Sequence, residues 1–255
     1  MSRVKKKKSS NIFSNILIII LIGIIIFSGY NLGKIFYRYH VGTQKYEKMQ
    51  ELAGVDKSIF DIDWAAIRAK YKGVKAWIYQ KGTKINYPVA QGDDNKYYLT
   101  HLLNGDWDIK GTIFIDYRCK DPFHQFNTIL YGHHMKDGTM FEPLVKYRDD
   151  EEYYRKHPML YISTPEQNYE VQVFSAMTIP ARSKLYKFDY PDPKTRREYL
   201  HTLIKENEIP DKAYMKKVLK GKPLSQKDRI VMLSTCTYEF NDARLTIFGR
   251  LVKSE

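Results

Sequence analysis

Three side chains in this 255-residue chain have types that together could carry out acyl transfer: Cys236, His133 and Arg244. A thiolate attacks a carbonyl carbon to form an acyl intermediate, and an imidazole beside it supplies the proton that the leaving group needs. A guanidinium close to the thiol favours the thiolate and can donate to the oxyanion that develops on the carbonyl. If the fold brings the three together, they predict cysteine-based acyl transfer.

Each of these residues also has a simpler interpretation. Free cysteine is among the most buried residue types, so Cys236 could lie in a core strand, with Arg244 an ordinary surface charge. His133 could be a polar loop residue that bonds to the backbone. No signature marks the Asn or Asp that orients the histidine in papain-like enzymes. The chemistry therefore depends on the elements that position these side chains.

The runs 230–236 and 244–252 are rich in apolar and β-branched residues and are joined by a segment that contains Asn241 and Asp242. This pattern predicts a hairpin with an irregular connection, in which Cys236 ends one strand and Arg244 begins the next. His133 follows an apolar strand and Gly132, so it should lie where a strand opens into a loop, a common place for catalytic groups.

Short apolar and aromatic runs with turn formers between them fill the region before this hairpin, and they predict a closed barrel or a sandwich. The predicted strands are 74–79, 85–90, 111–116, 128–131, 159–163 and 169–174. Residues 192–219 interrupt the series with two helical patterns separated by Pro210. Such an insertion is a common place for a binding wall or lid.

The chain has two cysteines, Cys119 and Cys236, and no CxxC pair, which argues against a zinc ribbon or a thioredoxin-like site. The simplest interpretation of Cys119 is a residue at a strand end that has no functional role. The alternative is a Cys119–Cys236 disulfide in an extracellular domain, which would block Cys236 as a nucleophile. Trp77 and Trp107 are expected to anchor the core.

Residues 9–33 carry no charge, and 16–27 are almost entirely Ile and Leu, enough to cross a bilayer as a helix. Lys5 to Lys8 precede this run, and the positive-inside rule keeps that end in the cytoplasm. A cleaved signal peptide is the alternative, but residues 27–30 offer no A-x-A-like site, which favours an uncleaved anchor. The remaining chain is therefore expected outside the cell.

The formal net charge of +13 could suggest nucleic acid as a partner, but seven of these charges lie in positions 1–38. The remaining +6 is scattered among acids without a basic stripe, which argues against nucleic acid. The predicted organisation is a cytoplasmic basic tail (1–11), a transmembrane anchor (12–33), a helical stalk (34–72) and a β-barrel catalytic domain (73–255).

At this point the residues carry a family resemblance. Leu-Ser-Thr-Cys236 followed by Arg244 resembles the Leu-x-Thr-Cys…Arg signature of sortases, the membrane-anchored transpeptidases of Gram-positive bacteria. The segments 131–133 and 135–141 are similar to the class B form of the catalytic histidine region. Residues 76–78, 85–89 and 94–101 resemble the early part of that class, and the insertion before the Cys236 strand fits it too. The likeness covers roughly residues 64–252 in consistent order.

The resemblance implies a sortase β-barrel of about eight strands with N-terminal helices. Cys236 would attack the Thr carbonyl of a C-terminal sorting signal on another exported protein and form a thioacyl-enzyme. His133 would protonate the leaving amine and later activate an amino group of a peptidoglycan precursor or a pilin. Arg244 would hold the substrate and stabilise the oxyanion.

The resemblance also implies a substrate groove, with Asn95 and Leu99 lining it and Ser234 contacting the substrate near the nucleophile. Together with the insertion, Tyr186 is expected to add to the wall. Adjacent residues in extended backbone point to opposite faces, so only one of His133 and His134 can face the site. His134 stands where the family often has Asn, which favours His133 as the catalytic histidine. Thr237 stands where some class B members have an acid. No metal or other cofactor is expected, and no calcium loop is visible.

Two other functions stay open from the sequence. One is a surface cysteine protease that hydrolyses its substrate without transferring it. The other is a membrane-tethered module, without enzymatic activity, that binds wall polymer or anionic lipid through its positive charge.

Overall fold

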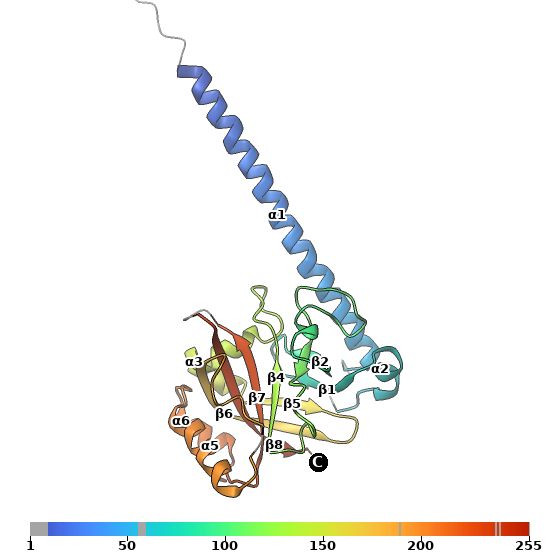
Figure 1. Ribbon diagram of the computed structural model, residues 1–255, viewed down its shortest axis with the longest axis vertical. Helices are drawn as coiled ribbons and strands as arrows, with labels where there is room; N and C mark the ends of the chain where they lie inside the picture. The colour runs from blue at the N-terminus through green and yellow to red at the C-terminus, as the bar shows by residue number, and fades with distance from the viewer. Residues whose placement is uncertain (1–9, 56–59, 189, 238, 240, 255) are drawn as a thin grey trace, which may run out of the picture.

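The computed structural model describes residues 10–55, 60–188, 190–237, 239 and 241–254. Its first element, α1 (Ser10–Ala53), is one long helix that projects from the rest of the molecule (Figure 1). Residues 1–9 of the predicted basic tail lie outside the described residues. The helix continues without a break across position 33, where the predicted anchor meets the predicted stalk.

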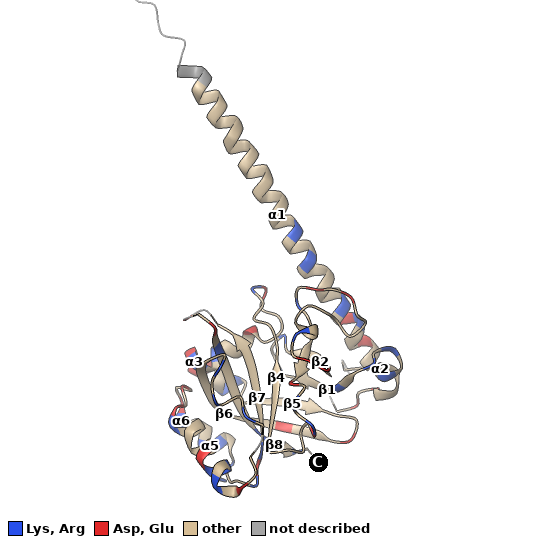
Figure 2. Cartoon of the chain, viewed as in Figure 1, with Lys and Arg blue, Asp and Glu red and all other residues tan. Residues whose placement is uncertain are grey.

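The outer part of α1 and its barrel-contacting end differ in exposure. Every large apolar side chain from Phe13 to Tyr37 is exposed, whereas Tyr46, Met49 and Ala53 are buried against the domain. Figure 2 shows the same division in charge, since the outer part of the helix carries no charged side chain before Lys34. By length and composition, α1 could therefore cross a membrane.

The domain is a closed eight-stranded barrel with the strand order β1-β2-β3-β4-β7-β8-β6-β5, which confirms the predicted fold. The strands are β1 (Val74–Tyr79), β2 (Asn86–Gln91), β3 (Ile113–Ile115), β4 (Asn127–Tyr131), β5 (Met159–Ser163), β6 (Asn168–Pro180), β7 (Arg229–Cys236) and β8 (Ala243–Lys253). Closure leaves no unpaired sheet edge, because β1 also pairs with β5.

Helices cover the barrel at several points. Before β1 lies α2 (Trp64–Lys70), whose N-cap Asp63 accepts from the Ala66 N–H at 2.8 Å. The predicted insertion forms α5 (Pro193–Lys205) and α6 (Lys212–Val218), each capped by an aspartate side chain. Four short helices were not predicted: η1 (Tyr97–Leu99), η2 (Glu142–Val145), α3 (Lys146–Asp149) and α4 (Glu151–Lys156). These are one or two turns long, too short for a helical period to show.

The two tryptophans expected in the core lie in different environments. Trp77 is fully buried on β1, as predicted, and its indole N–H donates to Asn86 at 2.7 Å. Trp107 is 54% exposed, so its prediction as a core anchor is wrong. It lies in the β2–β3 connection with the Arg38 guanidinium 5.4 Å from its ring centroid. Aromatic type alone did not distinguish the two, because burial depends on the element that carries the ring.

Candidate active site

The pairing of β4 with β7 places the predicted nucleophile and base at the same end of the barrel. The two strands are parallel, with Tyr131 opposite Ser234. His133 and Cys236 each stand two residues beyond this pair, so both lie at the same end of the two paired strands. The Gly132 N–H continues the contact by donating to the Ser234 carbonyl at 3.1 Å. Gly132 needs to be glycine, because a Cβ there would lie 2.6 Å from the Phe141 ring.

Arg244 reaches the same place through the antiparallel pairing of β7 with β8. Cys236 and Arg244 are direct partners in this register, so the predicted hairpin is present and its two residues face each other. Both side chains are half-buried. The Arg244 Nη1 donates to the carbonyl of Ala243 at 2.9 Å, which leaves further guanidinium donors for a ligand.

A cavity of about 360 Å³ opens at this end of the barrel, and all seven residues predicted for the site line it. The lining residues are Asn95, Leu99, Phe114, Tyr131, Gly132, His133, Ala181, Tyr186, Ser234, Thr235, Cys236 and Arg244. Its size is in the range of pockets that hold small ligands or a few residues of a peptide. The fold thus brings together every site residue that the sequence singled out, while the role of each remains a prediction.

His133 is oriented by a backbone group. Its Nε2 lies 2.7 Å from the Leu99 carbonyl oxygen, which can only accept, so this nitrogen carries a proton. In the neutral ring Nδ1 is then the free base. Papain-like sites orient the histidine with an Asn or Asp side chain, whereas the hydrogen-bond partner of His133 here is a backbone carbonyl. A backbone oxygen leaves no sequence signature, which is why the sequence analysis did not find an orienting group.

His134 contacts the nucleophile's backbone. Its Nδ1 donates to the Cys236 carbonyl at 3.0 Å, a bond that joins the loop after β4 to the end of β7. From the sequence, His134 served only to choose between the two histidines, and this contact was not predicted. The adjacency of the two histidines was the only available signal, and it does not show where the second ring points.

Tyr186 and Ser234 lie side by side in the lining of the cavity. The two hydroxyl oxygens are 2.8 Å apart, and the Tyr186 ring stacks beside Tyr131 with centroids 6.1 Å apart. Burial raises the pKa of Tyr186 to about 12, and the hydrogen bond to Ser234 and the charge of Arg244 oppose that shift. The phenol is therefore neutral and able to donate at any pH near neutrality.

A buried carboxylate, Asp116, supports two further lining residues, and no residue pattern in the sequence assigned it a role. It accepts from the Asn95 amide at 2.8 Å, the Tyr131 hydroxyl at 2.9 Å and the Arg118 guanidinium at 2.8 Å. Burial alone would raise the pKa of Asp116, but the hydrogen bonds from Arg118, Asn95 and Tyr131 outweigh it and hold this pKa below its ordinary value. As a charged hydrogen-bond acceptor, Asp116 thus fixes two cavity residues, Asn95 and Tyr131.

The two cysteines are free, so the alternative of a Cys119–Cys236 disulfide is wrong for this structure. Cys119 is buried, and burial raises the pKa of its thiol to about 11, which keeps it protonated and unreactive. Within the described residues, no group of three or more His, Cys, Asp or Glu side chains could hold a metal ion.

Comparison with known proteins fits this geometry. The sortase domain family matches residues 79–252, which is more than half of the sequence, so the chain belongs to the sortase family. Sortases are cysteine transpeptidases of the cell surface. The family therefore favours an enzyme over a non-enzymatic binding module.

Individual relatives define the class. Sortase B of Listeria monocytogenes is 31% identical over 245 residues, which cover 92% of this chain and 95% of that protein. The solved Staphylococcus aureus sortase B–substrate complex has a TM-score of 0.74 at 27% identity and covers 86% of this chain and 100% of its own. Sortase B from B. anthracis in complex with AAEK1 has a TM-score of 0.72 at 30% identity, with coverage of 86% and 100%. These matches confirm the class B assignment.

Proposed function

We propose that this class B sortase cleaves a C-terminal sorting signal of exported proteins after Thr and transfers the protein to an amino group. The observation that carries the proposal is the pair of strand registers, Tyr131 with Ser234 and Cys236 with Arg244, that gathers thiol, imidazole and guanidinium around one cavity. The acceptor is the amine of a peptidoglycan precursor, for anchoring to the cell wall, or of a pilin.

The reaction proceeds in two acyl transfers. The Cys236 thiolate attacks the Thr carbonyl carbon, and the oxyanion that forms is stabilised by Arg244 and nearby backbone N–H groups. His133 protonates the leaving amine, which departs with the C-terminal fragment and leaves a thioester on Cys236. The neutral imidazole then accepts a proton from the incoming amine, which attacks the thioester and releases the thiolate.

The other residues that line the cavity bind the substrate. Asn95, Leu99, Ser234 and Tyr186 all line the groove. The solved relatives include a substrate complex of sortase B from Staphylococcus aureus, which supports a peptide ligand for this cavity.

The helix α1 and the charges before it support a membrane-anchored enzyme. The helix spans the cytoplasmic membrane, Lys5 to Lys8 keep the N-terminus in the cytoplasm, and the barrel lies outside. A protein held there meets exported substrates as they emerge, together with membrane-bound wall precursors.

The test uses the full chain in detergent micelles, a library of C-terminal sorting-signal peptides and an amine acceptor, with mass spectrometry as the readout. We expect a peptide acyl adduct on Cys236 and an amine-dependent product. Cys236→Ala should abolish both, lowering turnover by roughly 10⁴-fold or more, since nucleophile removal in comparable enzymes has that effect.

Cys119→Ala is the matched control and should retain the adduct, because Cys119 is buried and lies outside the cavity. Cleavage at the same rate without an amine would identify a hydrolytic cysteine protease instead. The absence of any adduct on Cys236 would contradict the proposal.

A further inference from the structure

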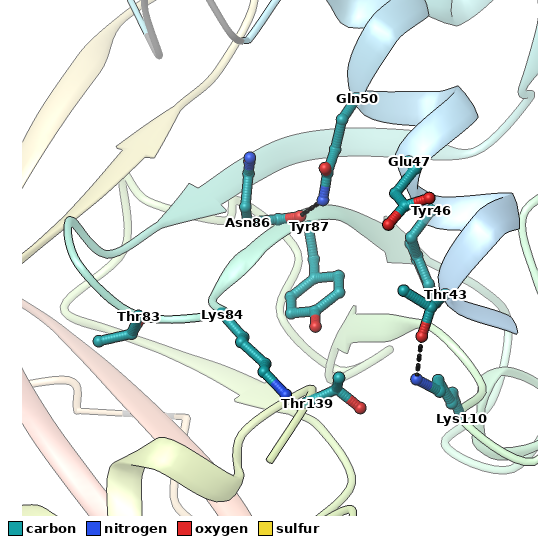
Figure 3. A pocket seen from close by; sticks show the side chains of 10 residues that line it. All are labelled: Thr43, Tyr46, Glu47, Gln50, Thr83, Lys84, Asn86, Tyr87, Lys110 and Thr139. Carbon is teal, nitrogen blue, oxygen red and sulfur yellow. Dashed lines mark hydrogen bonds between the residues drawn. The ribbon is translucent and has the colours of Figure 1, made fainter. Parts of the chain in front are cut away.

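A second cavity, of about 340 Å³, lies where α1 meets the barrel (Figure 3). Four of its residues come from the helix, and the others come from β2, the loop before it, and two connections that lead toward the active site. The lining residues are Thr43, Tyr46, Glu47, Gln50, Thr83, Lys84, Asn86, Tyr87, Lys110 and Thr139. Only Lys110 among them is a charged side chain that is fully buried.

Lys110 bridges the helix and the barrel. Its side chain is 1% exposed, and Nζ donates to the Thr43 hydroxyl of α1 at 2.8 Å and to the Asp137 carboxylate at 2.7 Å. Figure 3 shows the Thr43 contact reaching down from the helix. A buried ammonium is tolerated only where it is paired and hydrogen-bonded, so these contacts fix its position.

Asp137 belongs to the loop that follows His133. The loop closes on itself, because the Phe141 N–H donates to the His133 carbonyl at 2.9 Å. Asp137 also accepts from the Thr139 N–H at 3.1 Å, and its carbonyl accepts from Lys84 at 2.7 Å. Lys110 therefore holds the loop that carries the predicted base.

A second route leads from Lys110 to the same imidazole. The next residue, Gly111, accepts from the Tyr46 hydroxyl of α1, and Thr112 donates to the Tyr98 carbonyl at 2.8 Å. The Leu99 carbonyl, one residue further along this turn, holds His133 Nε2. The contact is close, since a Cβ on Gly111 would lie 2.3 Å from the Tyr98 oxygen. The two segments that contact His133, its own loop and the turn at Leu99, are thus held by Lys110 and by Thr112, two residues further along.

We propose that Lys110 is a positioning residue that ties the barrel-contacting end of α1 to His133, so that α1 helps to set the geometry of the active site. Neither Lys110 nor Asp137 lines the cavity of Cys236, so this role acts through His133 and not through the substrate. The catalytic part of the inference rests on the proposed function of His133.

The test compares two full-chain variants in lipid nanodiscs. Lys110→Met removes the ammonium but keeps the length of the side chain, and Thr43→Val removes the hydroxyl with little change of shape. We expect kcat for the sorting peptide to fall about tenfold, with KM within about twofold, because small displacements of a catalytic group can cost up to about 10²-fold. Thr43→Ser keeps a hydroxyl at this position and should therefore keep kcat close to that of the wild type.

Lys45→Met is the matched control. Lys45 also joins α1 to the barrel, through an exposed pair with Asp106 at 2.9 Å, but it does not reach the His133 loop. Exposed pairs contribute little, so this variant should keep kcat within about twofold. Unchanged kcat in both Lys110→Met and Thr43→Val, with only a lower melting temperature, would reduce Lys110 to a structural residue and overturn the proposal.

Hydrogen exchange of the peptide 133–141 gives a readout that needs no turnover. We expect its amides to exchange faster in Lys110→Met and Thr43→Val than in wild type or Lys45→Met. If the wild type exchanges as expected but shows no transpeptidation, the proposed function fails while the coupling of α1 to the loop stands. Exchange equal in all four proteins would overturn the coupling itself.

Discussion

The lining of the active-site cavity has two parts, a strand wall and a loop wall, that are built in different ways. One wall carries His133, Cys236 and Arg244 at or next to the ends of β4, β7 and β8, where continuous ladders of backbone hydrogen bonds fix the register. The other carries Asn95, Leu99 and Tyr186 on a 3₁₀ turn and on connections between elements. This second wall is held by individual side-chain bonds, such as Asn95 to Asp116 and Tyr186 to Ser234.

The difference suggests a division of labour. Reacting groups need fixed mutual geometry, which rigid strands provide, whereas a loop wall can change its side chains and contacts without disturbing the ladder. We therefore expect substitutions in the strand wall to act mainly on kcat and those in the loop wall mainly on KM.

Among substitutions that leave the nucleophile Cys236 in place, the largest effect should come from Arg244→Lys in the strand wall. Lysine keeps the positive charge but loses the planar set of donors that can hold the substrate and the oxyanion together. We expect kcat/KM to fall by roughly 10²-fold, the scale of losing one oxyanion donor. Arg197→Lys, at an exposed position on α5, is the control and should be neutral. A fully active Arg244→Lys enzyme would show that charge alone suffices in this wall.

Asp116→Asn should loosen the loop wall and change the response to acid. It weakens the hydrogen bonds to Asn95, Tyr131 and Arg118, and we expect KM to rise several-fold and stability to fall by about 1–3 kcal/mol at neutral pH. The folded-state pKa of Asp116 is held below its ordinary value, about 3.9 in an unfolded chain. Its stabilising contribution is therefore present above about pH 4 and is lost as the pH falls below that value.

Denaturant unfolding of wild type and Asp116→Asn between pH 6 and pH 3 measures this contribution. The two curves of unfolding free energy against pH should converge in acid. Asp93→Asn, an exposed neighbour, should run parallel to wild type. A constant gap between wild type and Asp116→Asn down to pH 3 would contradict the assigned role.

The smallest effect should come from Tyr186→Phe. It removes one hydroxyl bonded to Ser234, which is worth about 0.5–1.5 kcal/mol, so KM should rise about two- to tenfold while kcat stays the same. Because the pKa of Tyr186 is about 12, no step in the pH dependence of KM below pH 10 should come from this phenol. Ser234→Ala added to Tyr186→Phe should cost less than the sum of both changes. Additive losses would show that the two hydroxyls act separately.

Much of the fold was visible in the sequence because it depends on local patterns. The predicted run 74–79 has the bounds of β1, and the run 159–163 has those of β5. The run 230–236 starts one residue later than β7 starts and ends at the same residue. Residues 169–174 cover only part of β6, which runs on to Pro180, since alternation weakens in a strand that is buried on both faces. Apolar composition likewise predicted the membrane helix 12–33, which forms part of the longer α1.

The candidate site was predicted in types and only partly in arrangement. Cys236 and Arg244 could be placed as neighbours because a hairpin is a local structure. His133 was assigned beside Cys236 only through the family resemblance. No residue pattern marked Asp116, the Leu99 carbonyl or Lys110, because each acts through a partner distant in the chain or through a backbone atom.

The sequence by itself determined the apolar helix, most of the strands and the presence of a thiol, an imidazole and a guanidinium suited to acyl transfer. Only the tertiary structure decided that β4 lies parallel to β7, which joins segments 102 residues apart at His134 and Cys236. The reason is physical: periodicity records which face of an element is buried, but not which distant element buries it. Parallel pairing has no turn to reveal it, so closure of the whole barrel was needed to bring the imidazole and the thiol to the same cavity.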